Sequence, residues 1–599
     1  MPTSTDVSIV ASRADAMTLT VPALVDVVET AGYHTGGDGG GALYKRVASA
    51  PAHAGKFQDA SAAWFEICSL EINARQFGAI GDQAADDTAA LQSAIDYCQA
   101  MGKNLFIPEG RYKLSASLKV GYTPSGHDYR FDAFRISGAG AVSIWLDWTT
   151  ARGTILFTEQ DVPLLHYVKN AAWVAQSGNF YFENIRLQQV SETATAAVIK
   201  LDCLGGHSRL SELEIVNMGS GDGIHLIDSN GDVTFNSINI ANRDLVAFGL
   251  ATARVGTGVR MEANNNGCLV RVAKVRCRGF RTGFSIDLGS AYKLEQVECS
   301  VVNDGVVVGT AARAALIDAS HFEGIEGRAI VDRGNGTQVT KNHIYAYYAT
   351  VAGEGAQATT VWHGVTAIDS TEQTNSGCAY NGNSIFVGGS GSVGIDLFSK
   401  SDGSNLKKIA IGNMIKFDYG LTPGASKVKG IRVTSSPTTS ATAVDLFANT
   451  FIPEREWTNA PASGGAETAK IDHKAGRNIG VMPITDQYNE YPLFGQVGLM
   501  LAQGASALTT ADVNAGDLAV GAASAYDTDN IGNVSSITPI GNQARWLKFN
   551  VDAGSTFKRT GHLYLSGDFS GPGSLLLEMR RLGTDWYGFE ISRAKYSVA

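Results

Sequence analysis

Several features that mark other classes of protein are scarce or absent in this chain of 599 residues. It has 14 prolines and 68 glycines, a balance that favours short strands and tight turns over a disordered or collagen-like chain. Lys and Arg number 48 against 58 Asp and Glu, so the formal net charge is −10. The glycine and proline content therefore predicts an all-β protein. Because no basic excess is available to neutralise phosphates, we do not expect the protein to bind nucleic acid.

The sequence also lacks a cysteine framework and a membrane segment. Its seven cysteines are odd in number and have no CxxC spacing, so we interpret them as reduced core residues and expect neither a metal site nor another cofactor. No run of about 18 apolar residues is present, which argues against a membrane-spanning helix and against membrane insertion. The first residues, MPTSTDVSIVASRADAM, lack a basic segment followed by an apolar one, so no signal peptide is expected.

The stretch FGAIGDQAADDTAALQSAIDYC (77–98) predicts a helix near 87–100. Asp86 or Asp87 is placed to cap its start, because a carboxylate there can accept free backbone N–H groups. Gly102 predicts the end of the helix, NLFIP a short strand and PEGRY a turn. We favour this structural role for the two aspartates over a catalytic one. The apolar residues behind them recur at helical spacing: Leu91, Ala94, Ile95 and Cys98.

The pieces FGAIGD, DDTAALQSAID and NLFIPEGRY, within Ile72 to Tyr112, resemble a motif of the pectate-lyase-like superfamily of right-handed parallel β-helices. That superfamily includes phage tailspikes and exopolysaccharide depolymerases, and in it the motif builds the first coil and its capping helix rather than the active site. A second segment, AGYHTGGDGGGALYKRV (Ala31 to Val47), resembles N-terminal modules of phage and prophage tail proteins. The resemblance implies a right-handed single-stranded parallel β-helix and, without other support, a homotrimer.

Internal repeats favour the same architecture. Glycine followed by a short apolar strand recurs at Gly223, Gly258, Gly283, Gly305, Gly364, Gly394 and Gly430. Spacings of 25, 22 and 22 residues, from 258 through 283 and 305 to Gly327, each suit one coil of a solenoid. Three coils also carry an asparagine 19 residues after the glycine, namely Asn383, Asn413 and Asn449. We expect these side chains to stack and to bond between coils rather than bind a metal.

The repeat pattern ends after Trp457, which divides the chain into three expected regions. Residues 1–70 would form an N-terminal module that attaches to a virion, and residues 71–457 the β-helix. Residues 458–599 would form a C-terminal β-sandwich-like domain for trimerisation or carbohydrate binding. NAPASGGAET (459–468) has the composition of a linker, and ARWLKFNVD, HLYLSGDF and LLLEMRRL predict longer strands.

Catalytic chemistry is expected on the outer surface, because stacked apolar side chains fill the interior. The segments LEQVEC, IDASHF and VTKNHI align from Leu294, Ile317 and Val339, and each must bend once because both of its ends point inward. The second residues of the three segments are Glu295, Asp318 and Thr340. The fifth residues are Glu298, His321 and His343, and the preceding segment VAKVRC adds Arg276 to that column. Glu323 and Tyr345 occupy a neighbouring column.

With coils about 4.8 Å apart, Glu295 should lie near Asp318 and Glu298 near His321, so that four ionisable groups converge on one outer face. Two close carboxylates raise one pKa and can create the general acid that glycoside cleavage needs. The catalytic candidates are Glu295, Glu298, Asp318 and Glu323, and the substrate-binding candidates are Arg276, His321, His343 and Tyr345. A solvated charged face is the alternative interpretation of each residue, and Asp222 and Asp304 are better suited to turns.

The resemblance implies a phage tailspike that recognises and depolymerises a bacterial capsular, exo- or lipopolysaccharide. Endo-glycosidic hydrolysis is the first expectation and β-elimination by a lyase the second. Its partners would be that polysaccharide, two further copies of the chain, and a phage tail or baseplate protein bound through the N-terminus. It would then reside in the virion tail. A receptor-binding tail fibre without catalysis is a third possibility, and a bacterial lyase or epimerase is disfavoured by the missing secretion signal.

Overall fold

The computed structural model describes most of the chain, with gaps that concentrate in its C-terminal half. The described residues are 7–121, 133–168, 179–242, 254–262, 269–345, 363–367, 377–387, 393–399, 408–417, 429–435, 444–447, 449–452, 472–474, 506–508, 513–514, 517–520, 525–528, 532–539, 546–582 and 585–595. The chain divides into two compact units, of which the first comprises 1–400, 406–435 and 449–469 and the second 401–405, 436–448 and 470–599. The expected linker 459–468 lies outside the described residues.

A small mixed sheet forms the N-terminal part of the first unit. Its strands, in spatial order, are β1 (Val7–Val10), β2 (Val27–Thr30), β3 (Ala42–Val47), β5 (Trp64–Ile67) and β4 (Lys56–Gln58), and α1 (Arg13–Thr18) follows β1. Val28, Tyr44, Phe57 and Phe65 are buried in it. This region therefore has a small apolar core of its own.

The predicted helix is present as α2 (Thr88–Met101), preceded by β6 (Ile72–Asn73), η1 (Ala74–Phe77) and β7 (Asp82–Asp86). Its predicted apolar face is fully buried, and Gly102 ends it in the left-handed conformation at φ 60°. The role expected for Asp87 differs in detail. Asp87 holds the N-cap position, but its carboxylate accepts the backbone N–H groups of Ile80 at 2.6 Å and Gly81 at 3.0 Å. Asp86 accepts the N–H of Thr88 at 3.0 Å instead.

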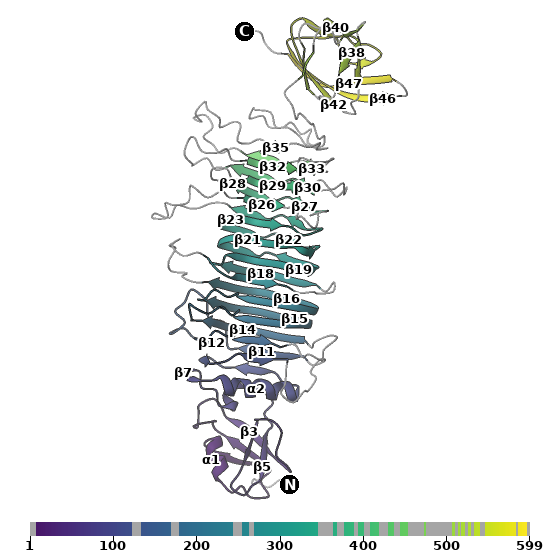
Figure 1. The fold of residues 1–599 in the computed structure, drawn as a ribbon. Coiled ribbons are helices and arrows are strands. Elements are labelled where there is room, and N and C mark those ends of the chain that lie inside the picture. Colours follow the sequence, from purple (N-terminus) through teal and green to yellow (C-terminus); the bar gives the residue numbers. More distant parts are fainter. Residues whose placement is uncertain are drawn as a thin grey trace. The chain divides into compact units, whose positions relative to one another are not determined.

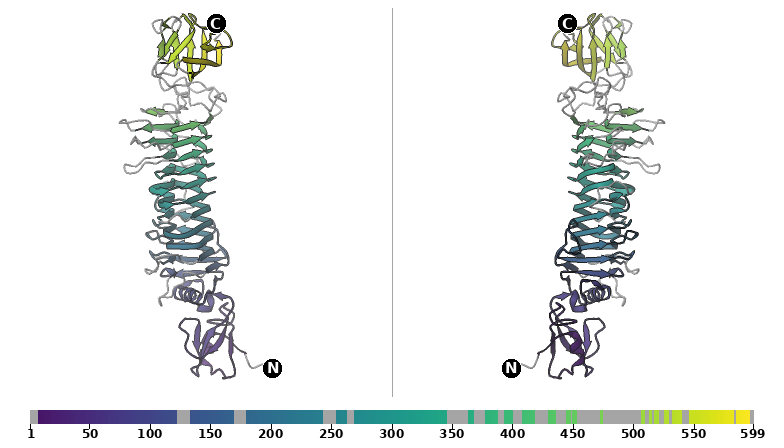
Figure 2. Two further views of the ribbon diagram at one scale, coloured as in Figure 1. Left: turned by 90° about the vertical axis from the view of Figure 1, so that its right-hand side faces the viewer. Right: turned by 90° about the vertical axis from the view of Figure 1, so that its left-hand side faces the viewer.

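Three parallel sheets, which we name I, II and III in the order that the chain meets them in a coil, build the solenoid (Figure 1). Sheet I stacks β10 (Leu118–Val120), β13 (Leu165–Tyr167), β15 (Ile199–Asn217), β16 (Ile224–Asn242), β17 (Thr257–Met261), β19 (Thr282–Ser290), β21 (Glu298–Arg313), β23 (His321–Asp332), β26 (His363–Ala367), β29 (Val393–Ser399) and β32 (Lys429–Ser435). The long strands continue from one sheet into another. The side views show the coils as parallel layers (Figure 2). The chain thus folds as a right-handed parallel β-helix, as expected.

Sheets II and III share several of those long strands. Sheet II contains β8 (Leu105–Ile107), β11 (Phe134–Gly138), β14 (Asn179–Gln189), parts of β15 and β16, β18 (Val270–Arg278), β20 (Tyr292–Glu295), β22 (Leu316–Asp318), β24 (Gln338–Thr340), β27 (Ala379–Asn381), β30 (Lys408–Ile411) and β33 (Val444–Phe447). Sheet III contains β9 (Gly110–Leu114), β12 (Thr154–Thr158), parts of β14, β15, β16, β18, β21 and β23, and then β25 (His343–Tyr345), β28 (Ser384–Val387), β31 (Met414–Phe417) and β34 (Thr450–Ile452). A further short strand is β35 (Asp472–Lys474).

One residue in the left-handed conformation turns the chain from sheet II to sheet III. In four successive coils this residue is Lys274, Gln296, Ala319 or Lys341, with φ between 50° and 55°. Non-glycine residues adopt this conformation at a cost, so the repeated bend requires compensation from the surrounding structure. The single bend predicted for each coil segment is confirmed.

An asparagine ladder follows the bend. Asn383 Nδ2 donates to Asn413 Oδ1 at 2.9 Å, and Asn413 Nδ2 donates to Asn449 Oδ1 at 2.8 Å. The ladder predicted from these three residues is therefore confirmed, and it begins one coil earlier, because Asn342 Nδ2 donates to Asn383 Oδ1 at 3.0 Å.

The glycines of sheet I lie against the core. A Cβ on Gly283 would lie 2.5 Å from the Sγ atom of Cys299, so no larger residue fits there without movement. The prediction that Gly327 starts the following coil was wrong. Val306 pairs with Ile330, which places Ala329 next to Gly305, because the register shifts between Val302 and Asp304.

The described residues from 506 onward, all in the second unit, form three β-sheets. They are β36 (Ser506–Leu508), β39 (Ala525–Thr528), β42 (Trp546–Val551), β46 (Gly573–Leu582), β47 (Asp585–Lys595) and β44 (Leu563–Tyr564); β37 (Val513–Asn514), β38 (Asp517–Val520) and β41 (Ser536–Pro539); and β40 (Gly532–Val534), β43 (Ser555–Phe557) and β45 (Phe569–Ser570). Its apolar core includes Phe549, Phe557 and Leu575. HLYLSGDF was wrongly predicted as one strand, since β44 and β45 belong to different sheets. In the parts that the structure describes, no helix has the length and apolarity to cross a membrane.

Candidate functional site

The predicted alignment of coils is confirmed by the strand register. Glu295 pairs with Asp318, and Asp318 with Thr340, all in sheet II. In sheet III, Arg276 pairs with Glu298, Glu298 with His321, and His321 with His343. Glu323 pairs with Tyr345 in the same sheet.

The expected convergence of Glu295, Asp318, Glu298 and His321 on one outer face is wrong. Glu295 ends β20 and Glu298 begins β21, and the left-handed Gln296 between them turns the chain into another sheet. The structure therefore brings Glu295 together with Asp318, and Glu298 with His321, as two separate sets.

Glu295 does not have the raised pKa that a general acid needs. Lys293 donates to one of its oxygens, and Arg271 Nε and Nη2 both lie 2.8 Å from Oε2. The hydrogen bond from Lys293, with that from Arg271, lowers the pKa of Glu295 below its usual value although burial opposes this. Asp318 accepts the hydroxyl of Thr340 at 2.6 Å. The expected carboxylate pair is thus held in the ionised form on the side of Glu295.

The sheet III candidates are also engaged with one another. Arg276 Nη2 lies 2.7 Å from Glu298 Oε2, and His321 Nε2 lies 3.5 Å from Glu323 Oε2. The rings of His321 and His343 stack with centroids 5.1 Å apart, and burial, together with the nearby His321, lowers the pKa of His343. This set presents ion pairs and stacked rings.

Tyr345, the remaining substrate-binding candidate, packs beside the histidines. Its ring centroid lies 6.0 Å from that of His343 and 4.7 Å from that of Phe386. The segment 351–362 lies outside the described residues.

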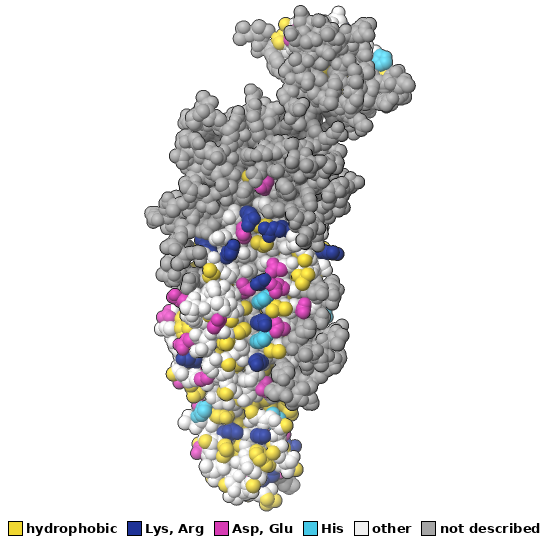
Figure 3. Space-filling model, in the orientation of Figure 1, with side chains coloured by type: hydrophobic (Ala, Val, Ile, Leu, Met, Phe, Trp, Pro, Cys, Tyr) yellow, Lys and Arg dark blue, Asp and Glu magenta, His cyan; other side chains and the backbone are white. Residues whose placement is uncertain are grey.

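Sequence reasoning missed a polar row on sheet I. Lys119, His166, Lys200, His225 and Arg260 are register neighbours in five successive coils, and we call them the cation–histidine row. Figure 3 shows Lys, Arg and His side chains in one line on the visible face, with acidic side chains beside it. Because adjacent strands are about 4.8 Å apart, each histidine has a cation on both sides.

Each histidine of this row contacts a carboxylate. His166 Nε2 lies 2.8 Å from Asp202 Oδ2, and His225 Nε2 lies 3.1 Å from Glu262 Oε2. The side chain of His225 is 18% exposed, so it is sheltered yet open to solvent on one side. A carboxylate fixes the orientation of an imidazole and stabilises its protonated form.

Acidic neighbours also hold Arg260. Its Nε lies 3.1 Å from Asp287 Oδ2, and its Nη2 forms an ion pair with Glu262. Burial favours a lower pKa for Arg260, but the nearby carboxylates of Glu262 and Asp287 outweigh burial and raise the pKa above its usual value. The guanidinium therefore remains charged. At the edge of the row, burial raises the pKa of Asp222, whose Oδ1 accepts the N–H of Thr257 at 2.8 Å.

The signal for this row was present in the glycine repeat. His225 and Arg260 stand two residues after Gly223 and Gly258, at a position that faces outward between buried neighbours such as Ile224 and Leu226. The apolar residues of the repeat, taken alone, do not reveal the row. Among the described residues, no group of three or more His, Cys, Asp or Glu side chains is arranged to hold a metal ion.

Comparison with known proteins places the row within a matched region. The model of the family described as "Rhamnogalacturonase A/epimerase, pectate lyase-like" matches residues 71–284. Mannuronan C5-epimerase AlgE3 of Azotobacter vinelandii is 47% identical over 47 residues, which cover 8% of this chain and 3% of that protein. The chain therefore spans a small fraction of the length of such curated relatives.

Solved structures that align with this chain include a polysaccharide epimerase module and phage tailspikes. The A-module of mannuronan C-5 epimerase AlgE6 of Azotobacter vinelandii aligns at 16% identity and a TM-score of 0.41, covering 64% of this chain and 100% of the module. The tailspike gp49 of Acinetobacter baumannii bacteriophage Fri1, a capsular polysaccharide depolymerase, aligns at 13% identity and 0.41, covering 75% and 76%. The tailspike of Acinetobacter phage vB_ApiP_P1 aligns at 13% and 0.39, covering 98% and 91%. Over residues 71–284, which include the complete cation–histidine row, the chain is similar to this pectate lyase-like family.

Proposed function

We propose that the protein cleaves an acidic bacterial surface polysaccharide by β-elimination on sheet I. The observation that carries this proposal is the position of His225 between Lys200 and Arg260 in the strand register. A base flanked by two cations suits a substrate whose reacting carbon bears a carboxylate, because the cations stabilise the charge that develops when its proton is removed.

In the proposed reaction, Lys200 and Arg260 bind the carboxylate of a uronic acid residue. His225 takes the proton from the carbon that bears this carboxylate. The electron pair left behind forms a carbon–carbon double bond as the neighbouring carbon–oxygen glycosidic bond breaks. Glu262, which lies 3.1 Å from the His225 ring, stabilises the imidazolium that results.

The leaving glycosidic oxygen requires a proton. Asp222 is suited to provide it, because burial raises the pKa of its carboxyl group and it lies three residues before His225. Its neighbours His225 and Arg260 oppose that rise. The carboxyl group of Asp222 would recover a proton from solvent after each cleavage.

Hydrolysis, the reaction first expected from the sequence, receives less support. It needs a carboxyl group that holds a proton beside a second carboxylate, and the lowered pKa of Glu295 suits this residue only to the second of these two roles. The same chemistry on sheet I without bond cleavage would be epimerisation, which product analysis distinguishes.

We further infer the setting of a phage tailspike: a homotrimer in the virion tail that attaches through residues 1–70 and meets the bacterial surface polysaccharide with its β-helix. The support is the resemblance of the segment 31–47 to N-terminal modules of phage tail proteins. The region 458–599 would then serve trimerisation or carbohydrate binding.

The test is product analysis with purified capsular polysaccharides, some containing uronic acid and some neutral. We expect shorter fragments with unsaturated uronate ends from the acidic polymers alone. His225→Gln should lower the rate by about 10² or more, because general-base catalysis contributes roughly that factor. His343→Gln, on sheet III, is the matched control and should leave the rate nearly unchanged.

Fragments that gain water would instead establish hydrolysis, and an unshortened polymer with inverted sugars would establish epimerisation. Binding of the polymer without any chemical change would support the receptor-binding fibre. Each of these three outcomes would refute β-elimination.

A further inference from the structure

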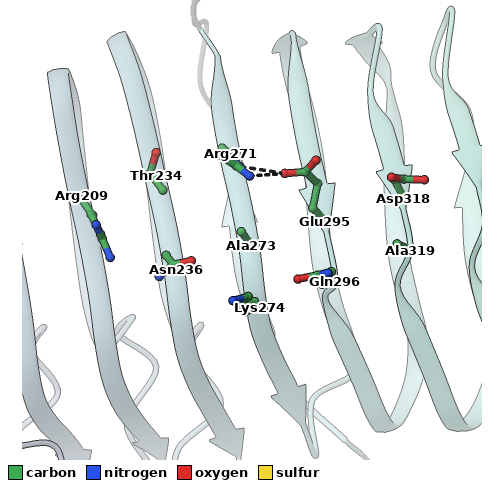
Figure 4. A pocket seen from close by; sticks show the side chains of 10 residues that line it. All are labelled: Arg209, Thr234, Asn236, Arg271, Ala273, Lys274, Glu295, Gln296, Asp318 and Ala319. Atoms are coloured by element: carbon green, nitrogen blue, oxygen red, sulfur yellow. Dashed lines mark hydrogen bonds and ion pairs between the residues drawn. The ribbon is translucent and has the colours of Figure 1, made fainter.

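A hollow of about 380 Å³ lies on sheet II, apart from the cation–histidine row. Its lining comes from five neighbouring strands, β15, β16, β18, β20 and β22. It also includes the bend residues Lys274, within β18, Gln296, after β20, and Ala319, after β22. Figure 4 shows its side chains spread over these strands, with Arg209 at one end and Asp318 at the other. Four strand spacings of about 4.8 Å separate those ends, or roughly 19 Å, a length suited to an oligosaccharide rather than one sugar.

Part of the charge in the hollow is already neutralised. Arg271 lies with Nε and Nη2 2.8 Å from Glu295 Oε2, and Lys293 pairs with the other oxygen of Glu295. Figure 4 shows this Arg271–Glu295 contact in the middle of the hollow. These contacts hold the side chains of Arg271 and Glu295 in place in the middle of the hollow.

Two other cationic side chains at the hollow, Arg209 and Lys274, have no ion-pair partner among the described residues. Among the described residues, the side chains of Arg209 and Lys274 form no ion pair or hydrogen bond, and both are exposed. Lys274 occupies the left-handed bend at φ 54°, which fixes the direction in which its side chain leaves the backbone. Arg209 and Lys274 thus border the hollow as two unpaired positive charges, near the amide of Asn236.

We infer that this hollow is a second saccharide-binding site, which takes an anionic oligosaccharide segment and takes no part in cleavage. Arg209 and Lys274 would pair with carboxylates of the ligand. Asn236, Gln296 and Asp318 would form hydrogen bonds with its hydroxyl groups, since a carboxylate accepts such bonds and a side-chain amide both accepts and donates them. Glu295 and Asp318, expected from the sequence to be catalytic, would then line a binding site instead.

The experiment measures binding of oligogalacturonates of graded length by titration calorimetry, with neutral malto-oligosaccharides for comparison. It uses the full-length chain carrying His225→Gln, so that the probe is not degraded. We expect two saturable sites per chain for the acidic probe, and affinity at the hollow that rises with length. Adding Arg209→Gln with Lys274→Gln should weaken one site about tenfold or more, because two charged contacts are lost.

The matched control is Arg313→Gln with Lys341→Gln. It removes the same charge from exposed positions outside the hollow, and Lys341 occupies the same bend position at φ 55°. Equal effects of the two double variants, or none from the first, would refute a site in the hollow, as would the absence of saturable binding. If the proposed function fails because sheet I does not bind the probe, a single site remains, and the Arg209→Gln and Lys274→Gln changes remove it. Failure of the proposed function can therefore be told apart from failure of the second site.

Discussion

At the scale of single residues, the partners of a buried carboxylate decide its charge. Glu214 on sheet III accepts the side-chain amide of Asn239 at 2.6 Å and the N–H of Ile144 at 3.0 Å, yet burial raises its pKa. The hydrogen bond from Lys293 and the contact with Arg271 lower the pKa of Glu295 instead. The deeper burial of Glu214, and the direct contact of Glu295 with two cations, thus shift the pKa values of these glutamates in opposite directions.

These opposite shifts predict opposite pH dependences of stability. A folded-state pKa above the unfolded one gives stability that is complete below about pH 4.5 and is lost as the pH rises, so Glu214 should stabilise the fold most in acid. Glu295 should stabilise it above pH 4.5 and lose this effect as the pH falls through its lowered pKa. We therefore expect the difference in Tm between wild type and Glu214→Gln to shrink with rising pH, and that for Glu295→Gln to grow.

Melting curves between about pH 3 and 8 test this prediction, since both glutamates titrate within that range. Each variant serves as the control for the other, because both replace glutamate by its amide in the same solenoid. Parallel pH profiles for the two variants would contradict the assigned shifts.

At the scale of elements, the bend and the asparagine ladder depend on each other. Three of the ladder asparagines immediately follow a left-handed residue: Asn342 follows Lys341, Asn383 follows Gly382 and Asn413 follows Gly412. The Nδ2 group of Asn383 also donates to the carbonyl of Val339 at 3.0 Å, which ties one coil to the coil before it. These buried bonds offset the cost of the bend.

Asn383→Ala should accordingly destabilise the solenoid by about 3 kcal/mol, because it leaves several buried polar groups without partners. Asn381→Ala is the matched control in the same coil. Its side chain accepts the exposed N–H of Ile411 at 3.1 Å, so its loss should cost less than about 1 kcal/mol. Urea denaturation compares the two, and similar midpoints would contradict the role of the ladder.

The coil register, the bend and the ladder could be predicted from the sequence, because a parallel stack repeats the same position in every coil. The charge of Glu295 could not be predicted from its own segment. It depends on Lys293 and on Arg271 in the preceding coil, and such contacts require side-chain directions that a linear alignment does not give. The shifted coil at Ala329 was missed for a similar reason, since a bulge adds a residue without a sequence mark.

At the scale of the whole molecule, the predicted assembly is a trimer. The loop before β12 presents two large apolar side chains to solvent, with Trp145 51% and Leu146 56% exposed. Parallel β-helices that associate side by side can cover such surfaces. Light scattering should therefore give three times 63.2 kDa, about 190 kDa, and the mass should persist on dilution. A stable particle of 63.2 kDa would exclude the trimer.

The alternation of cations and histidines in the cation–histidine row affects how a bound polyanion can move along the solenoid. A cation recurs at Lys119, Lys200 and Arg260, in every second coil, so equivalent contacts repeat at a period of roughly 10 Å. A polyanion displaced by one such period meets the same type of contact again. We therefore expect one-dimensional sliding with low barriers, so that successive cuts fall on one strand of polymer before it dissociates.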